Sequence, residues 1–167
     1  MESGKCPLTR CTVCSRAADP FIETLMSRDR SLLTFILVYG AASLVHFVHN
    51  AVYLQLYPNM PMWLTPLGVL SSWLVIAATG AAGYWLFREG LTVVGLGVIA
   101  LYAALGFGGL DHYAVAPFSA HSFVMNATIV GEASAASVLL VVIAWMGFWR
   151  APKVVFAEDG PNAKSID

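Results

Sequence analysis

The chain of 167 residues is 58% hydrophobic and only 11% charged, and its formal net charge is −1. A soluble globular domain carries roughly a quarter charged residues, so this composition excludes a water-soluble domain and predicts a membrane protein. The balance of charges and the lack of a basic stripe argue against nucleic acid as a partner.

The first 30 residues are polar, and they contain no apolar core followed by a small-residue cleavage site, so no secretory signal peptide is expected. This segment carries Cys6, Cys11 and Cys14. Cys11 and Cys14 form a CxxC pair, but no second pair or nearby histidine completes a zinc site. Free thiols in a reducing cytoplasm are expected, and a metal-delivery or oligomer-bridging site is the alternative.

Four apolar segments follow, and each has the roughly 20 residues that a membrane-spanning helix needs. The predicted spans cover residues 31–56, 66–87, 91–110 and 119–149. Backbone polar groups must be satisfied internally within a bilayer. The predicted fold is therefore all-α, an integral membrane four-helix bundle over residues 31–149, flanked by cytoplasmic segments at 1–30 and 150–167.

The basic residues predict the orientation of this bundle. All nine Lys and Arg residues lie before the first span, between the second and third, or after the fourth. The other two connections contain none. The positive-inside rule then places both termini in the cytoplasm of a plasma (inner) membrane protein, with the remaining two connections outside. All four histidines fall in the outer half of the bundle.

Polar residues form one stripe on each of two spans, following the steps of three and four that share a helix face. The stripe in the first span comprises Tyr39, Ser43, His46, Asn50 and Tyr53, with His49 beside it. The stripe in the last span comprises His121, Met125, Thr128 and Glu132, with Asn126 beside it. Ionisable groups within a membrane normally face the bundle interior and mark a function, so the two stripes are expected to face each other.

The rise of about 1.5 Å per helical residue places Glu132 nearly level with His46. The stripes therefore predict a buried group of His46, His49 and Glu132 below an upper group of Asp111, His112 and His121. Adjacent residues do not share a helix face, so Asp111 is expected to contact His121 across the loop. Ordinary interhelical hydrogen bonds are the alternative explanation for these polar residues.

The leading hypothesis is an outward-facing cavity that binds a transition metal, Cu, Zn or Fe, with possible redox chemistry. The predicted metal ligands are His46, His49, Glu132, His121 and His112. The residues expected to orient them are Asn50, Asp111, Tyr53, Asn126 and Thr128. The alternatives are haem b held by two histidines, and a quinone- or lipid-binding accessory subunit of a membrane complex or homo-oligomer. Whether the protein is an enzyme stays open.

Overall fold

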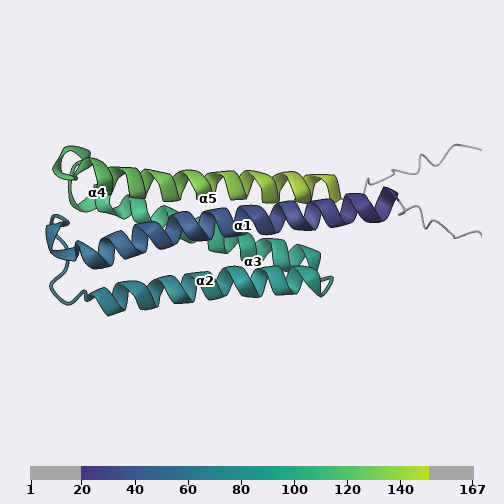
Figure 1. The fold of residues 1–167 in the computed structure, drawn as a ribbon, viewed down its shortest axis with the longest axis horizontal. Helices are drawn as coiled ribbons and strands as arrows, with labels where there is room; N and C mark the ends of the chain where they lie inside the picture. Colours follow the sequence, from purple (N-terminus) through teal and green to yellow (C-terminus); the bar gives the residue numbers. More distant parts are fainter. Residues whose placement is uncertain (1–19, 151–167) are drawn as a thin grey trace, which may run out of the picture.

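The computed structural model describes the backbone of residues 20–150 and the side chains of residues 29–148. The described part is helical between its connections and contains no strand, which confirms the predicted all-α fold. The predicted N-terminal segment, with Cys6, Cys11 and Cys14, lies outside the described residues apart from the start of the first helix. The predicted C-terminal tail also lies outside them. The elements in chain order are α1 (Pro20–Val52), η1 (Leu54–Leu56), α2 (Pro66–Arg88), α3 (Thr92–Leu105), η2 (Gly106–Asp111), α4 (His112–Val115), η3 (Phe118–Ala120) and α5 (Phe123–Arg150) (Figure 1).

Four stretches of the described chain are long and apolar enough to cross a membrane, in agreement with the sequence prediction. They cover Asp29–Val52, Pro66–Arg88, Thr92–Val115 and Phe123–Phe148. The first stretch ends at Val52 and not at residue 56, and the fourth begins at Phe123 and not at residue 119. The third extends beyond its predicted end at residue 110, because η2 and α4 continue α3 as helical turns. Asp111 and His112 therefore belong to the end of this helical stretch and not to a loop.

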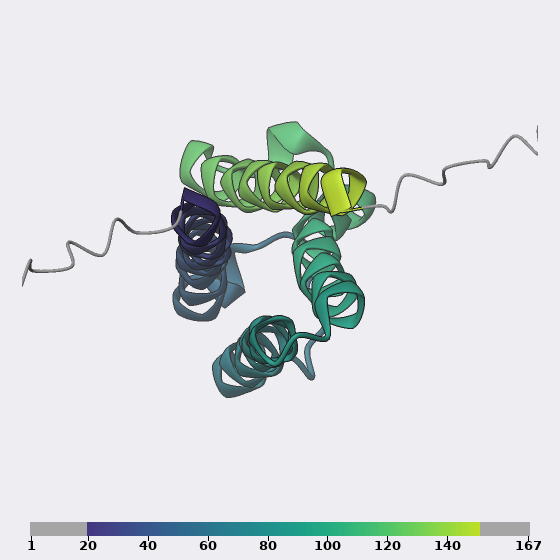
Figure 2. The ribbon, with the colours of Figure 1, turned by 90° about the vertical axis from the view of Figure 1, so that its right-hand side faces the viewer.

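The helices surround a common axis, as the end-on view in Figure 2 shows. Helix α1 packs against α2 and α5, and α3 packs against the same two helices. The connection from α2 to α3 turns at Gly90, whose φ of 86° suits a residue without Cβ. Beyond this turn α3 approaches α2 closely, since a Cβ on Gly95 would lie 2.5 Å from the backbone nitrogen of Phe87. Small residues at helix crossings are typical of membrane bundles.

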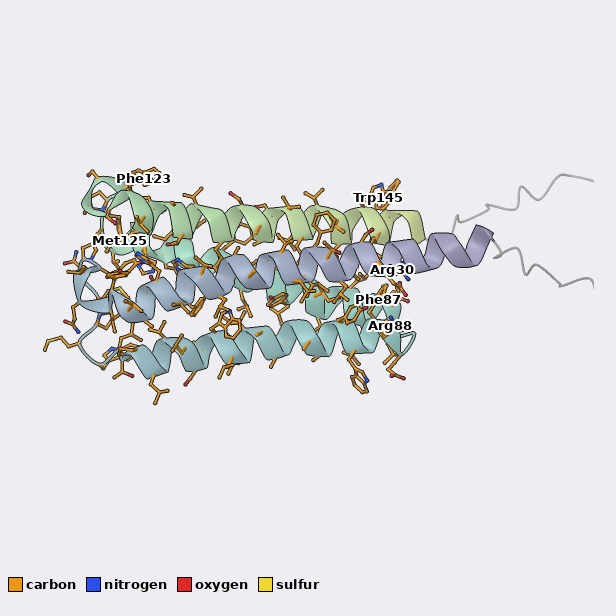
Figure 3. The ribbon with its side chains drawn as sticks, viewed as in Figure 1. Arg30, Phe87, Arg88, Phe123, Met125 and Trp145 are labelled. Carbon is orange, nitrogen blue, oxygen red and sulfur yellow. The ribbon has the colours of Figure 1, made fainter. Side chains whose placement is uncertain are left out.

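The two halves of the bundle differ in what fills them. An apolar core of aliphatic and aromatic side chains occupies the half that contains Arg30 and Arg88, and we call that end the arginine end (Figure 3). Tyr39 and Tyr102 close this core with rings 4.6 Å apart, and the Tyr39 hydroxyl donates to the Tyr102 carbonyl at 3.2 Å. The opposite end, where α1 ends and α5 begins, holds the histidines and is called the histidine end.

Candidate functional site

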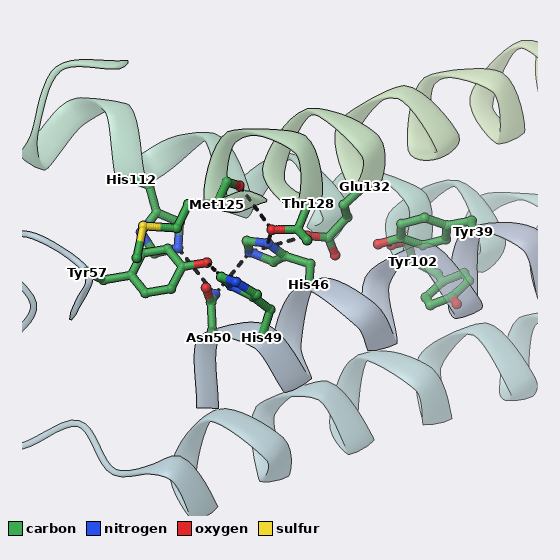
Figure 4. A network of polar contacts seen from close by, with 10 residues as sticks. All are labelled: Tyr39, His46, His49, Asn50, Tyr57, Tyr102, His112, Met125, Thr128 and Glu132. Atoms are coloured by element: carbon green, nitrogen blue, oxygen red, sulfur yellow. Dashed lines mark hydrogen bonds and ion pairs between the residues drawn. The ribbon is translucent and has the colours of Figure 1, made fainter. Parts of the chain in front are cut away.

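Buried polar side chains gather in the half of the bundle toward the histidine end. The buried polar or charged residues of the described part are Ser43, His46, Asn50, His112, His121, Asn126 and Glu132. They come from α1, α4, α5 and the turn before α5, so segments far apart in sequence converge on one interior region (Figure 4). Buried polar groups are costly unless they are hydrogen-bonded, and the partners of each group therefore reveal what the region can do.

The orientation of His46 is determined by Thr128. The Thr128 hydroxyl donates its one hydrogen to the carbonyl of Met125 at 2.9 Å. Nδ1 of His46 lies 3.4 Å from the same hydroxyl oxygen, so Nδ1 carries the proton and donates to it. In the neutral imidazole only one ring nitrogen is protonated. Nε2 of His46 is therefore an unprotonated lone pair.

This nitrogen also lies near the carboxylate of Glu132. Nε2 of His46 lies 3.6 Å from Oε2 of Glu132, with the two side chains 2% and 1% exposed. Neither carboxylate oxygen forms a hydrogen bond of standard geometry within the described residues, and the buried Ser43 hydroxyl is a polar neighbour of Glu132. A buried ionised carboxylate is costly unless it is protonated or a cation lies beside it.

Asn50 connects His46 to His112. Its side-chain nitrogen lies 3.0 Å from Nε2 of His46 and 3.3 Å from Nε2 of His112, and it donates one hydrogen to each (Figure 4). Nε2 of His112 is therefore also an acceptor. The Asn50 oxygen has no partner in the described part of the chain. Two imidazole lone pairs thus flank one amide group, with the carboxylate of Glu132 beside the first of them.

Gly109, in η2, leaves the space in which these groups meet. A Cβ at this position would lie 3.1 Å from Oε2 of Glu132 and 3.4 Å from Nε2 of His46. It would therefore approach both of the atoms that face each other. The adjacent Gly108 differs, because a Cβ there meets no atom within 4 Å.

His49 is not part of the group that contains His46 and Glu132, which corrects the grouping expected from sequence. Its Nδ1 lies 2.8 Å from the Tyr57 hydroxyl, and its ring lies 4.7 Å from that of exposed Tyr53. His112 takes the expected place of His49, because α4 continues the third helical stretch and brings this ring 5.6 Å from that of His46. His112 thus belongs with His46 and not with His121 in an upper group, and His49 belongs with Tyr57.

The other predicted residues lie around this centre. His121 is buried, and its Nδ1 bonds the Pro117 carbonyl at 3.1 Å instead of Asp111, which is exposed. Nε2 of His121 has no partner among the described residues. Asn126 accepts from the Tyr113 hydroxyl at 2.9 Å and donates to the backbone of the turn that precedes α5. Asn126 therefore holds the turn in place through the backbone of Phe118 and His121, and it bonds no side chain of a metal-ligand candidate.

Tyr57 is a central residue that the two polar stripes did not include. Its ring lies 4.8 Å from that of His112 and 6.3 Å from that of His121, and its hydroxyl bonds His49. Burial raises the pKa of Tyr57 to about 12. Tyr57 lies directly before Pro58, at the end of the histidine-bearing segment. This position is the sequence feature that could have identified it as part of the site. Gly109 was equally missed, because a run of glycines in a span is typical of close helix packing.

As the side chains stand, no group of three or more His, Cys, Asp or Glu residues in the described part is arranged to hold a metal ion. The amide of Asn50 lies between the two imidazoles and occupies the position between their lone pairs. The centre nevertheless brings together two imidazole acceptors and a carboxylate, groups that attract a cation. Comparisons of the chain with protein-family models, curated proteins and solved structures find no match.

Proposed function

We propose that this chain is an integral membrane protein that binds one divalent transition-metal ion. The ligands are Nε2 of His46, Nε2 of His112 and the carboxylate of Glu132. Two imidazoles with one carboxylate form a ligand set that suits zinc and iron. His49 and His121, which the sequence offered as ligands, are outside this set because their rings are held by Tyr57 and by Pro117.

The observation that carries the proposal is the 3.6 Å gap between Nε2 of His46 and the unpartnered Oε2 of Glu132. Two ligand atoms on a tetrahedral ion, each about 2.1 Å from it, lie about 3.4 Å apart. The observed separation is close to this distance between two ligand atoms, and it is too long for a hydrogen bond. An ion there would neutralise the carboxylate and take the His46 lone pair to which Asn50 donates.

Asn50 occupies this centre in the absence of an ion, donating N–H groups to the same lone pairs that would hold the metal. Binding then requires the amide to rotate away and His112 to move toward His46. With three protein ligands, a fourth position stays open for water or a substrate, as in catalytic zinc sites. That open position is compatible with an enzyme, and its substrate is unassigned.

The site is proposed to face the outside of the plasma membrane. Arg30 and Arg88 both lie at the end of the bundle opposite the histidines (Figure 3). The positive-inside rule assigns the arginine end, and with it both termini, to the cytoplasm. The outer half of the bilayer then surrounds the buried centre.

Metal titration of the purified full-length protein tests the proposal. The protein, stripped with a chelator and placed in lipid nanodiscs, is expected to bind one equivalent of Zn²⁺. Co²⁺ in its place is expected to give the intense visible bands of a four-coordinate nitrogen and oxygen site. His112→Ala should abolish both signals and His49→Phe should retain them. Binding that depends on His49 and not on His112, or no specific binding at all, would refute the proposed ligand set.

Haem b is the second cofactor that the histidines could hold, and the geometry gives it less support. The Nε2 atoms of His46 and His112 flank a single Asn50 nitrogen, which leaves no room for a porphyrin without a large rearrangement. An optical spectrum of the protein as isolated tests this alternative directly. A Soret band that is lost in His46→Ala would replace the metal-ion proposal with haem.

A further inference from the structure

A second site lies at the histidine end, beside His49. It is a pocket of about 480 Å³ between the end of α1, η1 and the start of α5. Three of its lining residues are polar, His49, Tyr53 and Ser122, and the apolar lining includes Leu56, Val124 and Met125. Its volume lies within the usual range for small-molecule sites, roughly 300–1,000 Å³.

The lining determines the charge of a ligand. No lining residue is a lysine, arginine, aspartate or glutamate. The arginines with described side chains, Arg30 and Arg88, lie at the opposite end of the bundle (Figure 3). An anionic headgroup would find no cation to pair with in this pocket, and a charged group buried without a partner is costly. The pocket therefore suits a neutral headgroup.

The lining also determines the shape and polarity of that headgroup. The His49 and Tyr53 rings lie 4.7 Å apart with an interplanar angle of 42°, so they offer faces and edges to a planar ring. The thioether of Met125 makes favourable contacts with aromatic rings. The Tyr57 hydroxyl engages Nδ1 of His49 at 2.8 Å and holds the imidazole in one orientation. Nε2 of His49 has no hydrogen bond within the described residues and is left to a ligand.

The pocket opens where a membrane-dissolved molecule would arrive. Leu56 and Val124 line it and are 67% and 52% exposed, and Phe123 beside them is 86% exposed. Exposed apolar side chains at the end of a spanning helix contact lipid. A ligand with an apolar tail could lay that tail along α5 while its head enters between His49 and Tyr53.

We infer that this pocket binds a neutral, membrane-soluble quinone or quinol, with a ring oxygen hydrogen-bonded to Nε2 of His49. Quinones combine a planar ring, neutral oxygens that accept or donate hydrogen bonds, and an apolar tail, and each matches one feature of the lining. The inference does not depend on the proposed metal ion. Tyr57 lies between the two sites, since its hydroxyl bonds His49 and its ring packs on His112.

Photolabelling in nanodiscs of neutral lipid tests this inference. The probe is a short-chain benzoquinone that carries an aryl azide, and the labelled peptides are identified by mass spectrometry. Label is expected on the segment from His49 to Leu56 and on the start of α5, and an excess of the unlabelled quinone should remove it. A second, apolar groove lies between α1 and α2, where Leu37, Trp73 and Tyr84 line it. Label confined to that groove, or label that competing quinone does not remove, would overturn the inference.

Variants of His49 sharpen the test. His49→Phe is expected to weaken quinone binding at least tenfold, and His49→Gln, which retains a hydrogen-bonding group, to weaken it less. Tyr84→Phe, in the groove between α1 and α2, is the control and should bind as the wild type does. Thermal unfolding of each variant separates loss of binding from loss of the fold. Equal affinity in His49→Phe, or displacement of the probe by phospholipid alone, would show that quinone recognition by His49 is wrong. Zn²⁺ binding by the same variants reports separately on the metal site.

Discussion

Nε2 of His46 on α1 lies 3.6 Å from Oε2 of Glu132 on α5, and both side chains are almost fully buried. The Thr128 hydroxyl fixes the proton of His46 on the far ring nitrogen, so Nε2 accepts from Asn50 and has no proton to donate to the carboxylate beside it. Leaving an ionised carboxylate buried without a partner costs several kcal/mol. The pair is therefore stable only with a shared cation, a proton or a metal ion, and the predictions below distinguish the two.

Replacement of Gly109 by alanine should weaken metal binding without removing a ligand. The new Cβ would lie 3.1 Å from Glu132 Oε2 and 3.4 Å from His46 Nε2, so it would crowd both atoms that hold the ion. We expect roughly a 10- to 100-fold loss of Zn²⁺ affinity, the range typical of changes beside a metal site. Competition of the protein with a fluorescent chelator measures the affinity.

Gly108→Ala is the matched control, because its Cβ meets no atom within 4 Å and the same helical turn receives the same methyl group. Its Zn²⁺ affinity should equal that of the wild type. Equal affinities in both variants would mean that the ion does not lie between His46 and Glu132.

Glu132→Gln should abolish metal binding and stabilise the protein in the presence of a chelator. The substitution replaces the buried carboxylate with a neutral amide of nearly the same shape, and Nε2 of His46 keeps its hydrogen bond from Asn50. Removing a buried polar group that lacks a hydrogen-bond partner raises the free energy of unfolding by about 1–3 kcal/mol. Thermal unfolding in nanodiscs measures the change. A lower stability of the ion-free variant would mean that the carboxylate has a stabilising partner when no metal is bound.

The fold could be predicted from the sequence because the pattern that indicates it, a long apolar segment, is repeated along the chain. Four apolar runs of spanning length leave few alternatives within a bilayer, and the rise per residue brought His46 level with Glu132. Both outcomes depend on regular helices, which sequence periodicity describes well. The predicted facing of the two stripes agrees with the contact between these residues.

The details of the site did not follow, because they depend on where the third helical stretch ends. The sequence predicted a loop from Asp111, and the structure has 3-10 turns and α4 there. Those turns carry His112 toward His46 and leave Asp111 exposed. The choice of histidine in the buried centre also depends on the 2.8 Å contact between His49 and Tyr57. Helical spacing alone does not predict such a side-chain contact.

Gly95→Ala should destabilise the α2–α3 hairpin. Its Cβ would lie 2.5 Å from the Phe87 backbone nitrogen, so the two helices would have to separate. Overpacking of this kind costs typically 1–3 kcal/mol, measurable as a lower unfolding temperature. Gly97→Ala, two residues along the same helix and with open space around its Cβ, should be neutral or slightly stabilising. Equal effects of the two substitutions would contradict this packing.

A cysteine at Met62 should react with a membrane-impermeant maleimide added to intact cells. Met62 is fully exposed, and it lies in the connection between α1 and α2 at the histidine end. The proposed orientation puts this connection outside. The wild type supplies the control, since Cys6, Cys11 and Cys14 are predicted to be cytoplasmic and should react only after permeabilisation. Labelling of the wild type in intact cells with no gain from Met62→Cys would reverse the orientation.

The buried hydroxyl of Tyr57 should make the stability fall at alkaline pH. Burial raises its pKa from 10.0 to about 12, so between these values the unfolded chain has lost the proton while the folded chain retains it. Unfolding then releases a proton, and the free energy of unfolding decreases as the pH rises, by at most about 1.4 kcal/mol per pH unit. The contribution is constant below about pH 9, where both states are protonated.

Tyr57→Phe isolates this contribution, because it removes the proton and keeps the ring that packs on His112. The variant should be less stable than the wild type near neutral pH, since His49 loses its 2.8 Å hydrogen bond. Its stability should then decline less steeply from about pH 9 to about pH 11.5, so that the two curves converge. Denaturant titrations in nanodiscs across this range measure both slopes. Parallel curves would mean that the Tyr57 hydroxyl ionises as it does in water, and that the aromatic cluster around it is open to solvent.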